Sequence, residues 1–588
     1  MEWVEARSYR DEIDGIRMLA VTSVFLFHLG FLENGYLGVD IFFAISGFLI
    51  TGTLYRQHQA GKLSIQRFYI KRFRRILPLV LATISVALSL GIGTMLPGDL
   101  ENLSQSVIAT SFFANNVLSY LTIFDYWDVW NEYKPLMHTW SLGIEEQYYF
   151  LYPFIFLLLP IGRGKAIHAI IFGLAIVSFG LYLWQSNVAT RFYLLQYRFW
   201  ELAAGGLLAI SLERKLLVVQ HRWIIWAALV WLLCAPVSLM PAPVALATTV
   251  LLTCIGLGTV GRDGTATDLL VTPISIWIGK ISFSLYMWHQ IVLAFARYTY
   301  TQEIDYPTAG ILIAITAALS ICSYFFIEEP FRRGLLSDKV FLAGLLIGYA
   351  LVCAAAGWIY LRGGIVRDVP ELGIVAANPS GETSADYNDR VYAMTEPFDR
   401  NDKLKIFVVG NSFARDFANI ILESKYSDLV DISYSYPMEY DSSDSRWTQA
   451  DIVVGYPLDQ TRYSGLGYDK YIDTSRLYAI GTKNFGVNNG LIYNGKIDDY
   501  CSQQARLTSG CRIIHRDLQQ LWGNRYINLL KYVSNDIVNV DVFTDDCQFF
   551  SHDTRHLTKA GAEQFGKYIS SDPTFFLHQY LNRARFNR

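Results

Sequence analysis

Residues Gly15–Gly30, "GIRMLAVTSVFLFHLG", form an apolar stretch that contains two ionisable side chains, Arg17 and His28. The stretch predicts a membrane-spanning helix. With a turn of about 100° per residue, the two side chains fall within about 20° of one face, about 16 Å apart along the axis. Ionisable residues are costly in a span, and those present usually face a protein interior or a watery cavity. We therefore expect Arg17 and His28 to line one polar path through a helical bundle.

The composition supports a membrane protein with a polar second part. Of 588 residues, 52% are hydrophobic and only 17% are charged, which is too apolar for a soluble chain. Leu103–Phe124 is a candidate re-entrant or surface segment. Apolar runs of about 20 residues predict about eleven spans, near Ile16–Phe31, Tyr36–Tyr55, Ile76–Leu96, Leu142–Ile161, Ala166–Trp184, Phe199–Leu212, Trp223–Leu239, Val244–Val260, Ile274–Phe295, Gly310–Ile327 and Val340–Leu361.

The distribution of basic residues predicts the orientation of these spans. Loops on the side of the N-terminus carry roughly sixteen Lys and Arg, whereas the opposite loops carry about three, and basic loops stay in the cytoplasm. An odd number of spans then places everything after Leu361 outside the cell membrane. We expect a multi-pass membrane protein with a cytoplasmic N-terminus and a C-terminal domain on the opposite side of the membrane.

The chain becomes polar after Leu361, so we expect a transmembrane domain at 1–361, a linker or extension at 362–402 and a second domain at 403–588. In the second domain, "LKIFVVGNSF" is a short apolar strand that leads into a turn and a helix-like segment. "ADIVVGYPL" and "RLYAIGT" are further buried-strand patterns, and "TKAGAEQFGKYISS" is a closing helix. Strands that alternate with helices predict an α/β domain with a parallel sheet.

The second domain carries a candidate nucleophile with a candidate base. Ser412 follows the first strand and precedes a helix, where a helix N-terminus and backbone N–H groups stabilise an oxyanion. Asp553 and His556 are three residues apart in "SHDTRHLTKAGA", a spacing that lets a carboxylate orient an imidazole that deprotonates a serine. We predict a Ser412–His556–Asp553 triad. The alternative is a helix-capping serine and a surface histidine.

These two blocks resemble the SGNH hydrolase family over about 190 residues, from Lys403 onward. That family has Gly-Asp-Ser in its nucleophile block and Asp-x-x-His in its last block. Here the first block reads "GNS", with Asn411 where Asp is usual, which changes the polarity around the serine. The resemblance also implies oxyanion residues, for which the candidates are Gly455 and Asn484 or Asn488.

The cysteines bear on the same domain. Cys501, Cys511 and Cys547 lie in the part expected outside, where a disulfide is permissible, and Cys501–Cys511 is the preferred pair because it closes a short loop. No cluster of His, Cys or Asp has metal-ligand spacing, so we expect no metal. No basic block indicates nucleic acid as a partner.

The membrane part carries a second resemblance. "RDEIDGIRMLAVTSVFLFHLG", "RFYIKRFRRILP", "PLMHTWSLGIEEQYYFLYP", "YRFWELAAGGLLA", "ISFSLYMWHQIVL" and "YFFIEEPFRR" occur in this order. The set resembles the acyltransferase-3 family of bacterial membrane acyltransferases, in the version with an eleventh span and an SGNH domain that modifies O-antigen or peptidoglycan. The resemblance implies cytoplasmic acetyl-CoA as donor and a sugar hydroxyl of a polysaccharide or lipid-linked glycan, such as lipopolysaccharide O-antigen, as acceptor. It also implies a bacterial inner membrane, with the C-terminal domain and the acceptor on the periplasmic side. Peptidoglycan or another exopolysaccharide is the alternative acceptor.

The residues make chemical sense in that light. Arg17 is suited to the pantetheine–phosphate end of the donor or to positioning its thioester, and His28 to acting as general base or acetyl relay. The alternative for His28 is a satisfied polar residue in a bundle. A cytoplasmic basic cluster suits the phosphates of acetyl-CoA, although it also fits a topology signal with snorkelling side chains: Arg67, Lys71, Arg72, Arg74 and Arg75.

Further charged or polar residues in the spans are expected to face a central cavity, with structural and functional roles equally open. These are Glu145, Glu146, Arg198, Glu201 and His289. Arg198 and Glu201 are three apart and form a candidate ion pair within the bundle.

Three rival functions remain. A transporter or flippase would share the spans and buried charges, but inverted repeats are not evident. A membrane-anchored carbohydrate esterase would need far fewer spans. A sensor with an inactive Ser412 is the third. Replacing Ser412 by Ala separates them, since transport would persist, esterase activity would vanish and acetyl transfer would fail at its last step.

Overall fold

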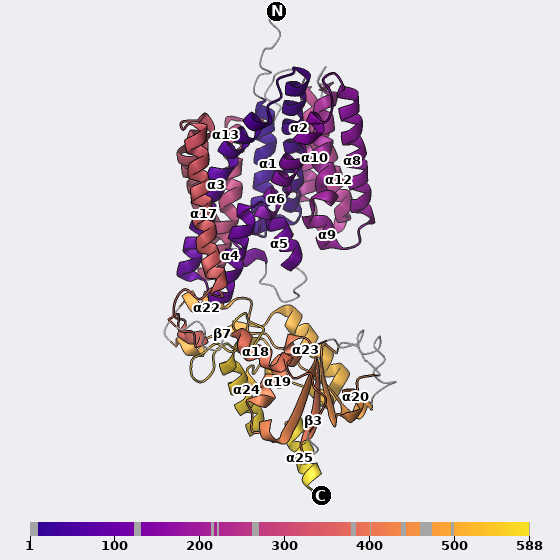
Figure 1. Cartoon of the computed structure of the whole chain (residues 1–588), viewed down its shortest axis with the longest axis vertical. Helices are drawn as coiled ribbons and strands as arrows, with labels where there is room; N and C mark the ends of the chain where they lie inside the picture. The colour runs from indigo at the N-terminus through magenta and orange to yellow at the C-terminus, as the bar shows by residue number, and fades with distance from the viewer. Residues whose placement is uncertain are drawn as a thin grey trace, which may run out of the picture. The chain divides into compact units, whose positions relative to one another are not determined.

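A computed structural model describes residues 10–122, 131–212, 217–219, 223–261, 270–377, 384–399, 402–436, 443–458, 473–495 and 499–586. The chain divides into two compact units. The first comprises 1–95 and 99–361, and the second comprises 362–588 together with 96–98. The first unit is built from helices, whereas the second contains a sheet with helices around it (Figure 1).

The helices of the first unit include long ones that overlap the predicted apolar runs and shorter ones between them. They are α1 (Asp11–His28), α2 (Gly38–Gln59), α3 (Ile65–Thr94), α4 (Pro97–Ser111), α5 (Asn115–Thr122), α6 (Thr139–Leu151), α7 (Pro153–Leu157), α8 (Gly164–Trp184), α9 (Val188–Tyr193), α10 (Leu195–Ser211), α11 (Trp223–Cys234), α12 (Ala242–Gly258), α13 (Pro273–Lys280), α14 (Ser282–Thr299), α15 (Tyr306–Ser323), α16 (Glu329–Arg333) and α17 (Asp338–Leu361). Two three-residue strands, β1 (Leu217–Val219) and β2 (Thr259–Gly261), pair in parallel.

Among the described residues, five helical segments are long and apolar enough to cross a membrane. α11 and α12 are shorter apolar helices. Two predicted spans are interrupted, one before Pro153, whose ring and missing N–H suit the start of a helix, and one at Ile281 between α13 and α14. A multi-pass helical unit is therefore confirmed, whereas eleven spans stay a prediction. The five segments are Glu33–Gln59, Ile65–Thr94, Gly164–Trp184, Tyr306–Arg333 and Asp338–Leu361.

Small residues allow α2 and α10 to pack closely at the centre of this unit. A Cβ on Gly47 would lie 1.8 Å from the carbonyl oxygen of Leu202, and a Cβ on Gly205 would lie 2.0 Å from that of Ala44. Helices in membranes associate through such small-residue contacts because lipid gives no hydrophobic driving force between them. The contact sets the position of α2, whose residues line both cavities described below.

The second unit contains the predicted parallel sheet. Its strand order is β4-β3-β5-β6-β8, and every neighbouring pair is parallel. A two-stranded antiparallel ribbon joins β7 (Gln504–Arg506) to β9 (Asn539–Asp541). The prediction of an α/β domain is confirmed. The sheet strands are β3 (Leu404–Gly410), β4 (Val430–Ser435), β5 (Ile452–Tyr456), β6 (Leu477–Ile480) and β8 (Tyr526–Ile527).

Helices cover this sheet and hold the ends of its strands. On one face, Trp447, Leu518 and Trp522 pack against Phe407 and Val453 in the core. α19 and α24 pack against each other (Figure 1). The segment expected as a linker contains α18, in which Val391 is fully buried. The helices are α18 (Ser384–Tyr392), α19 (Ser412–Leu422), α20 (Arg446–Gln449), α22 (Asn489–Asn494), α23 (Ser509–Trp522), α24 (Lys559–Ser571) and α25 (Phe576–Phe586).

The predicted disulfide is wrong in one partner. Cys501 is bonded to Cys547, across 46 residues, and Cys511 is a free, buried thiol. Cys511 lies in the first turn of α23, where its side chain is directed into the core and contacts the hydroxyl of Thr482 at 3.9 Å. Closeness in sequence misled the prediction, because the helix turns Cys511 away from Cys501.

Part of the orientation argument lies outside the described residues. The basic residues counted at 213–216, 220–222 and 262 belong to that part, as does the end of the candidate re-entrant segment at 123–124. The described part of that segment forms α4 and α5, which are separated by a turn at Phe113, where φ is +54°.

Candidate functional site

Ser412 lies at the junction between β3 and α19. The strand ends at Gly410, where φ is +132° and a Cβ would lie 1.9 Å from the carbonyl oxygen of Tyr456, so only glycine fits. Asn411 caps the helix, and its side chain accepts the N–H of Phe413 at 3.0 Å. Asn411 therefore acts as a helix cap where the resembled family has Asp. The cap leaves Ser412 as the first helical residue, at the helix N-terminus.

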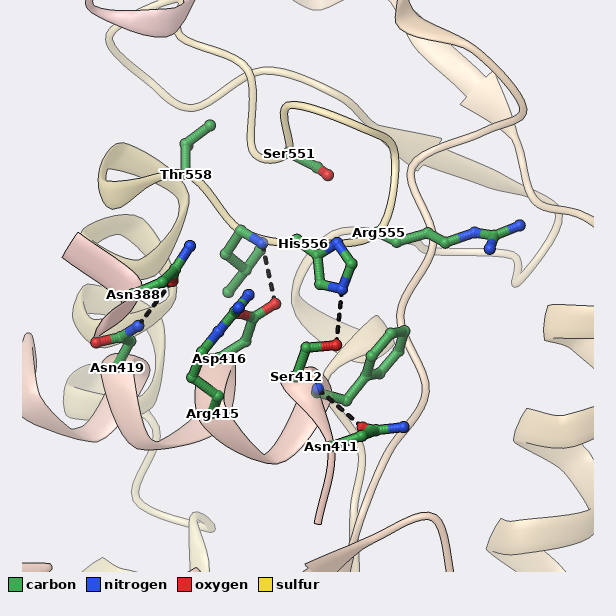
Figure 2. A network of polar contacts seen from close by, with 12 residues as sticks. Asn388, Asn411, Ser412, Arg415, Asp416, Asn419, Ser551, Arg555, His556 and Thr558 are labelled. Carbon is green, nitrogen blue, oxygen red and sulfur yellow. Dashed lines mark hydrogen bonds and ion pairs between the residues drawn. The ribbon is translucent and has the colours of Figure 1, made fainter. Parts of the chain in front are cut away.

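The structure brings the three predicted triad residues together, and Figure 2 shows the contact between Ser412 and His556. The Oγ of Ser412 donates to the Nε2 of His556 at 2.7 Å, and the Nδ1 of His556 donates to Asp553 at 2.5 Å. A nucleophile, a base and an orienting carboxylate in this order are the arrangement that serine acyl-transfer enzymes use. The His556 side chain is 13% exposed, so a substrate has access to it.

Asp553 is held by more than His556. Its Oδ1 accepts the N–H groups of Arg555 at 3.0 Å and His556 at 2.7 Å, and the hydroxyl of Ser551 at 3.2 Å. Burial opposes ionisation, but the neighbouring His552 and His556 and these hydrogen bonds outweigh it and hold the pKa of Asp553 well below its usual range. The carboxylate therefore stays charged and keeps His556 in the Nδ1–H tautomer.

The candidate oxyanion residues have structural contacts of their own. The amide of Asn484 donates to the carbonyl oxygens of Gly486 at 2.8 Å and Thr554 at 3.4 Å. Asn488 caps α22 by accepting the N–H of Gly490 at 2.6 Å, and Gly455 lies within strand β5. Their roles toward an oxyanion remain predictions. Ser412 is the first residue of α19, and the N–H groups at a helix N-terminus favour a negative charge.

Sequence reasoning missed Asp416 and Lys483, which lie beside the triad. One carboxylate oxygen of Asp416 accepts the N–H of Leu557 at 3.0 Å and lies 2.8 Å from the ammonium of Lys483. The other accepts Arg415 at 2.7 Å. Asp416 is four residues after Ser412 and therefore on the same helix face, which is the signal that was available. The Asp416–Leu557 bond fixes the residue that follows His556 (Figure 2).

His552 also lies beside the triad. Ligand atoms of His552, Asp553 and His556 lie within 4.8 Å of one another, although their sequence spacing had suggested no metal site. The closest pair in this group is the His556–Asp553 hydrogen bond itself. The grouping therefore belongs to the triad.

In the first unit, several predicted residues line one cavity of about 110 Å³. Arg17 lies at its wall and is paired with Asp14 at 3.0 Å. Glu145 also lines it, and accepts from the hydroxyls of Ser46 and Tyr149. We call this space the arginine cavity. Its charged lining residues are Arg17, Arg72, Arg75 and Glu145.

The five residues of the basic cluster separate in the structure. Arg72 and Arg75 line the arginine cavity, and Arg72 lies over the ring of Tyr149 at 3.9 Å and 3.9 Å from Glu146. Arg74 instead binds Asp338 at 2.8 Å, and Arg67 and Lys71 are exposed. The helix period explains the division, because α3 turns successive side chains to different sides.

His28 lies in a second cavity of about 130 Å³, which shares Val39 and Tyr286 with the arginine cavity. We call it the histidine cavity. Arg198 lines it and binds Asp40, and its Nε lies 2.5 Å from Glu201. The predicted Arg198–Glu201 pair is present, and Asp40 was missed. The ring of His289 lies 5.1 Å from that of His28. Arg17 and His28 thus face two adjoining cavities.

A family model for an acyltransferase domain matches residues 10–327. This chain belongs to the acyltransferase-3 family. The match includes every lining residue of both cavities. The family resemblance expected from the sequence is therefore confirmed, and we call the first unit the acyltransferase unit.

Several named relatives are similar to this chain over part of their own length. A Staphylococcus aureus (strain MSSA476) protein with the provisional name O-acetyltransferase is 30% identical over 351 residues, 55% of this chain and 58% of the relative. The peptidoglycan O-acetyltransferase OatA of Listeria monocytogenes is 30% identical over 357 residues, 56% of each chain.

The provisionally named membrane-bound transacylase BcsY of Komagataeibacter xylinus is 26% identical over 360 residues, 59% of this chain and 89% of the relative. The chain thus spans little more than half the length of the first two relatives. No solved structure matches it.

Proposed function

We propose that the chain is a multi-pass O-acetyltransferase that moves an acetyl group from cytoplasmic acetyl-CoA to a hydroxyl of a cell-surface polysaccharide. Lipopolysaccharide O-antigen is the acceptor that we propose first, and peptidoglycan or another exopolysaccharide is the alternative. Membership of the acyltransferase-3 family supports the reaction class. The name of the Listeria relative supports a cell-wall glycan, and that of the Komagataeibacter relative supports transacylation at a membrane.

One observation carries this proposal: the guanidinium of Arg75 lines the arginine cavity, and no carboxylate of the described residues lies within ion-pair distance of it, although Glu328 attracts it from farther away. Arg17 and Arg72 lie in the same wall. Arginine is the residue best suited to phosphate groups, which acetyl-CoA carries in number. We propose that Arg75 and Arg72 bind these phosphates, and that Arg17, fixed by Asp14, positions the thioester end.

The second unit supplies the last step. We propose that the Oγ of Ser412 attacks the acetyl carbonyl while His556 takes its proton. His556 then passes this proton to the leaving oxygen or sulfur, so that the donor alcohol or thiol departs and acetyl-Ser412 remains. A sugar hydroxyl then gives its proton to His556 as its oxygen attacks the acetyl carbon, and Ser412 recovers the proton. Asp553 stabilises the imidazolium in both steps.

The proposed placement follows from the reaction. We infer a cytoplasmic N-terminus, about eleven spans in a bacterial inner membrane, and a periplasmic SGNH-like domain at 403–588 after an extension at 362–402. The sheet with Ser412 after its first strand, and Asp553 and His556 before α24, supports the SGNH-like assignment. A donor in the cytoplasm and an acceptor outside require such a path across the bilayer.

The rival with the most support is a membrane-anchored carbohydrate esterase, because the triad alone would suffice for hydrolysis. An anchor would not need the two polar cavities that lie inside the acyltransferase unit. The arginine cavity therefore favours the transferase over the esterase.

The test is the acetyl content of the cell-surface polysaccharide, measured by mass spectrometry in cells that express wild type, Arg75→Gln, His28→Ala or Ser412→Ala. Wild type should add the mass of an acetyl group to the repeating unit, and the His28 and Ser412 variants should abolish this addition. His58→Ala is a matched control, because His58 is buried in the same unit but lines neither cavity. Full acetylation by His28→Ala would contradict the proposal and favour the esterase.

A further inference from the structure

The histidine cavity differs from the arginine cavity in its charge. Its guanidinium, Arg198, is held by two buried carboxylates, Asp40 and Glu201, all of them at most 2% exposed. Arg191 lies over the ring of Tyr182, 5.6 Å from its centroid. Among the described residues at this cavity, the two guanidinium groups of Arg198 and Arg191 are matched in number by the two carboxylates of Asp40 and Glu201, so their formal charges sum to zero. The lining as a whole therefore does not carry the excess positive charge that a phosphate requires. The occupant that this lining favours is neutral.

The base in this cavity is fixed in one tautomer. The Nε2 of Gln290 donates to the carbonyl oxygen of Lys134 at 3.2 Å, which turns the Oε1 of Gln290 toward His28. The Nδ1 of His28, at 2.9 Å, must then donate, because an amide oxygen can only accept. The Nε2 of His28 is left with its lone pair. Gln290 is buried and was not predicted from the sequence.

A second histidine in the cavity wall lacks a full hydrogen bond. His138 is 2% exposed, and neither of its ring nitrogens makes a hydrogen bond of full geometry with the described residues, its one backbone interaction being a weaker contact with Met287. Its ring lies 5.2 Å from that of His289 and 5.3 Å from that of Tyr286. A buried polar group without a full hydrogen bond costs free energy, so such a group in a cavity wall indicates that a ligand or water completes it.

The rest of the lining is aromatic and apolar. Trp140, Phe192 and Phe27 supply flat surfaces, and Tyr36 and Tyr182 supply hydroxyls. A ligand with apolar C–H faces and a rim of hydroxyl groups is complementary to such a site, since ligand pockets combine an apolar lining with a few placed polar groups. A sugar ring has this chemistry.

We propose that the histidine cavity binds a sugar that accepts the acetyl group within the acyltransferase unit, before Ser412 acts. This inference rests on the proposed function and names a carrier between the two chemical steps. The hydroxyl oxygen of the sugar attacks the thioester carbon of acetyl-CoA and its proton passes to the Nε2 of His28. The carbon–sulfur bond breaks, and the proton neutralises the departing thiolate, so that an O-acetyl sugar and free CoA result. His138 binds a hydroxyl of the sugar.

The experiment places the full chain in membranes of the organism that encodes it, with acetyl-CoA radiolabelled in the acetyl group as the probe. In the Ser412→Ala variant, label should accumulate in an alkali-labile ester on a carbohydrate fraction that is not protein. Adding His138→Ala should lower this label by roughly tenfold or more, because the hydroxyl loses its partner. Adding His58→Ala, the matched buried histidine, should leave the label unchanged.

His138→Gln keeps a donor and an acceptor at the same place and should retain more label than His138→Ala if both variants reach the membrane in equal amount. Full label in both His138 variants would overturn the inference. So would a Ser412→Ala variant that incorporates no label while wild type acetylates polysaccharide, because Ser412 would then itself be the first acceptor. A wild type that transfers no label at all would instead refute the proposed function, which keeps the two failures distinct.

Discussion

The ammonium of Lys483 lies 2.8 Å from the carboxylate of Asp416, and neither side chain is more than 2% exposed. The pair joins the segment after β6 to the helix that carries Ser412. Asp416 in turn holds the backbone of Leu557, next to His556. Burial opposes ionisation of Asp416, but Lys483, Arg415 and His556 outweigh it and keep the pKa of Asp416 below its usual range. The ion pair therefore helps to fix the distance between nucleophile and base.

Lys483→Met should destabilise the second unit, because it leaves one oxygen of the buried Asp416 carboxylate without its ammonium partner, while Arg415 still binds the other. Breaking a buried pair from one side costs about 3–5 kcal/mol. The free energy of unfolding is measured by pulse proteolysis of the full chain in urea, read at fragments from 404–586. The exposed Lys71→Met should change it by less than about 0.5 kcal/mol.

The double variant Asp416→Asn/Lys483→Met separates a coupled pair from two independent contacts. It removes both charges, so it should be less destabilised than the two single variants added together. Strict additivity would contradict the coupling inferred from the 2.8 Å contact.

Asp553→Asn should lower esterase activity of the full chain toward p-nitrophenyl acetate by roughly 10³–10⁴-fold, since an amide no longer enforces the Nδ1–H tautomer of His556. The variant keeps the shape of the side chain, so folding should be retained. Asp428→Asn, in a surface turn, is the control. Activity within tenfold of wild type in Asp553→Asn would show that Asp553 does not orient the base.

The site residues that were predictable from the sequence are those that lie close to one another along the chain. Arg17 and His28 share one helix, and Asp553 and His556 share one turn, so helical period and local spacing sufficed for them. The strand-to-helix junction identified Ser412 in the same way. Each of these signals depends on residues within about a dozen positions of one another.

Other relationships arise only when distant segments pack together. Lys483 meets Asp416, and His138 meets His289, because the sheet and the bundle bring those segments together. The disulfide shows the same limit, since Cys501 pairs with Cys547 rather than with its neighbour in sequence. The sequence predicted one binding site for the basic cluster at 67–75. In the structure only Arg72 and Arg75 of this cluster line the arginine cavity, because a helix distributes neighbouring residues around its axis.

Cys511 should resist alkylation at neutral pH. Burial raises the pKa of its thiol to about 11, and only the thiolate reacts. At pH 8 about one thiol in a thousand is ionised, and the alkylation rate should rise about tenfold per pH unit up to pH 10. Peptide mapping of the native full chain after treatment with iodoacetamide measures this rate.

The same map tests the disulfide. Cys501 and Cys547 should appear as one linked peptide without reductant, whereas Cys511 should appear as a free thiol. A linked peptide that contains Cys511 would contradict the structure. Rapid labelling of Cys511 at pH 8 would show instead that its site opens to solvent.

Arg75→Gln should weaken the use of acetyl-CoA. Its guanidinium lines the arginine cavity, and no carboxylate of the described residues lies within ion-pair distance of it, so under the proposed function its charge binds a phosphate of the donor. Loss of a charge-assisted hydrogen bond to phosphate should raise the KM for acetyl-CoA about tenfold or more while the KM for the acceptor stays constant. The rate of CoA release from membranes that contain the full chain gives both constants.

Lys71→Gln provides the matched comparison, because it removes one positive charge from the same helix at an exposed position outside the cavity. If the arginine cavity binds the donor, Lys71→Gln leaves the KM for acetyl-CoA near the wild-type value. If the basic segment acts only through its overall charge at the membrane surface, both variants change the KM for acetyl-CoA equally. Raising the ionic strength then brings the KM of wild type and of both variants to the same value. An equal effect of the two variants would therefore shift the donor site from the cavity to the surface of α3.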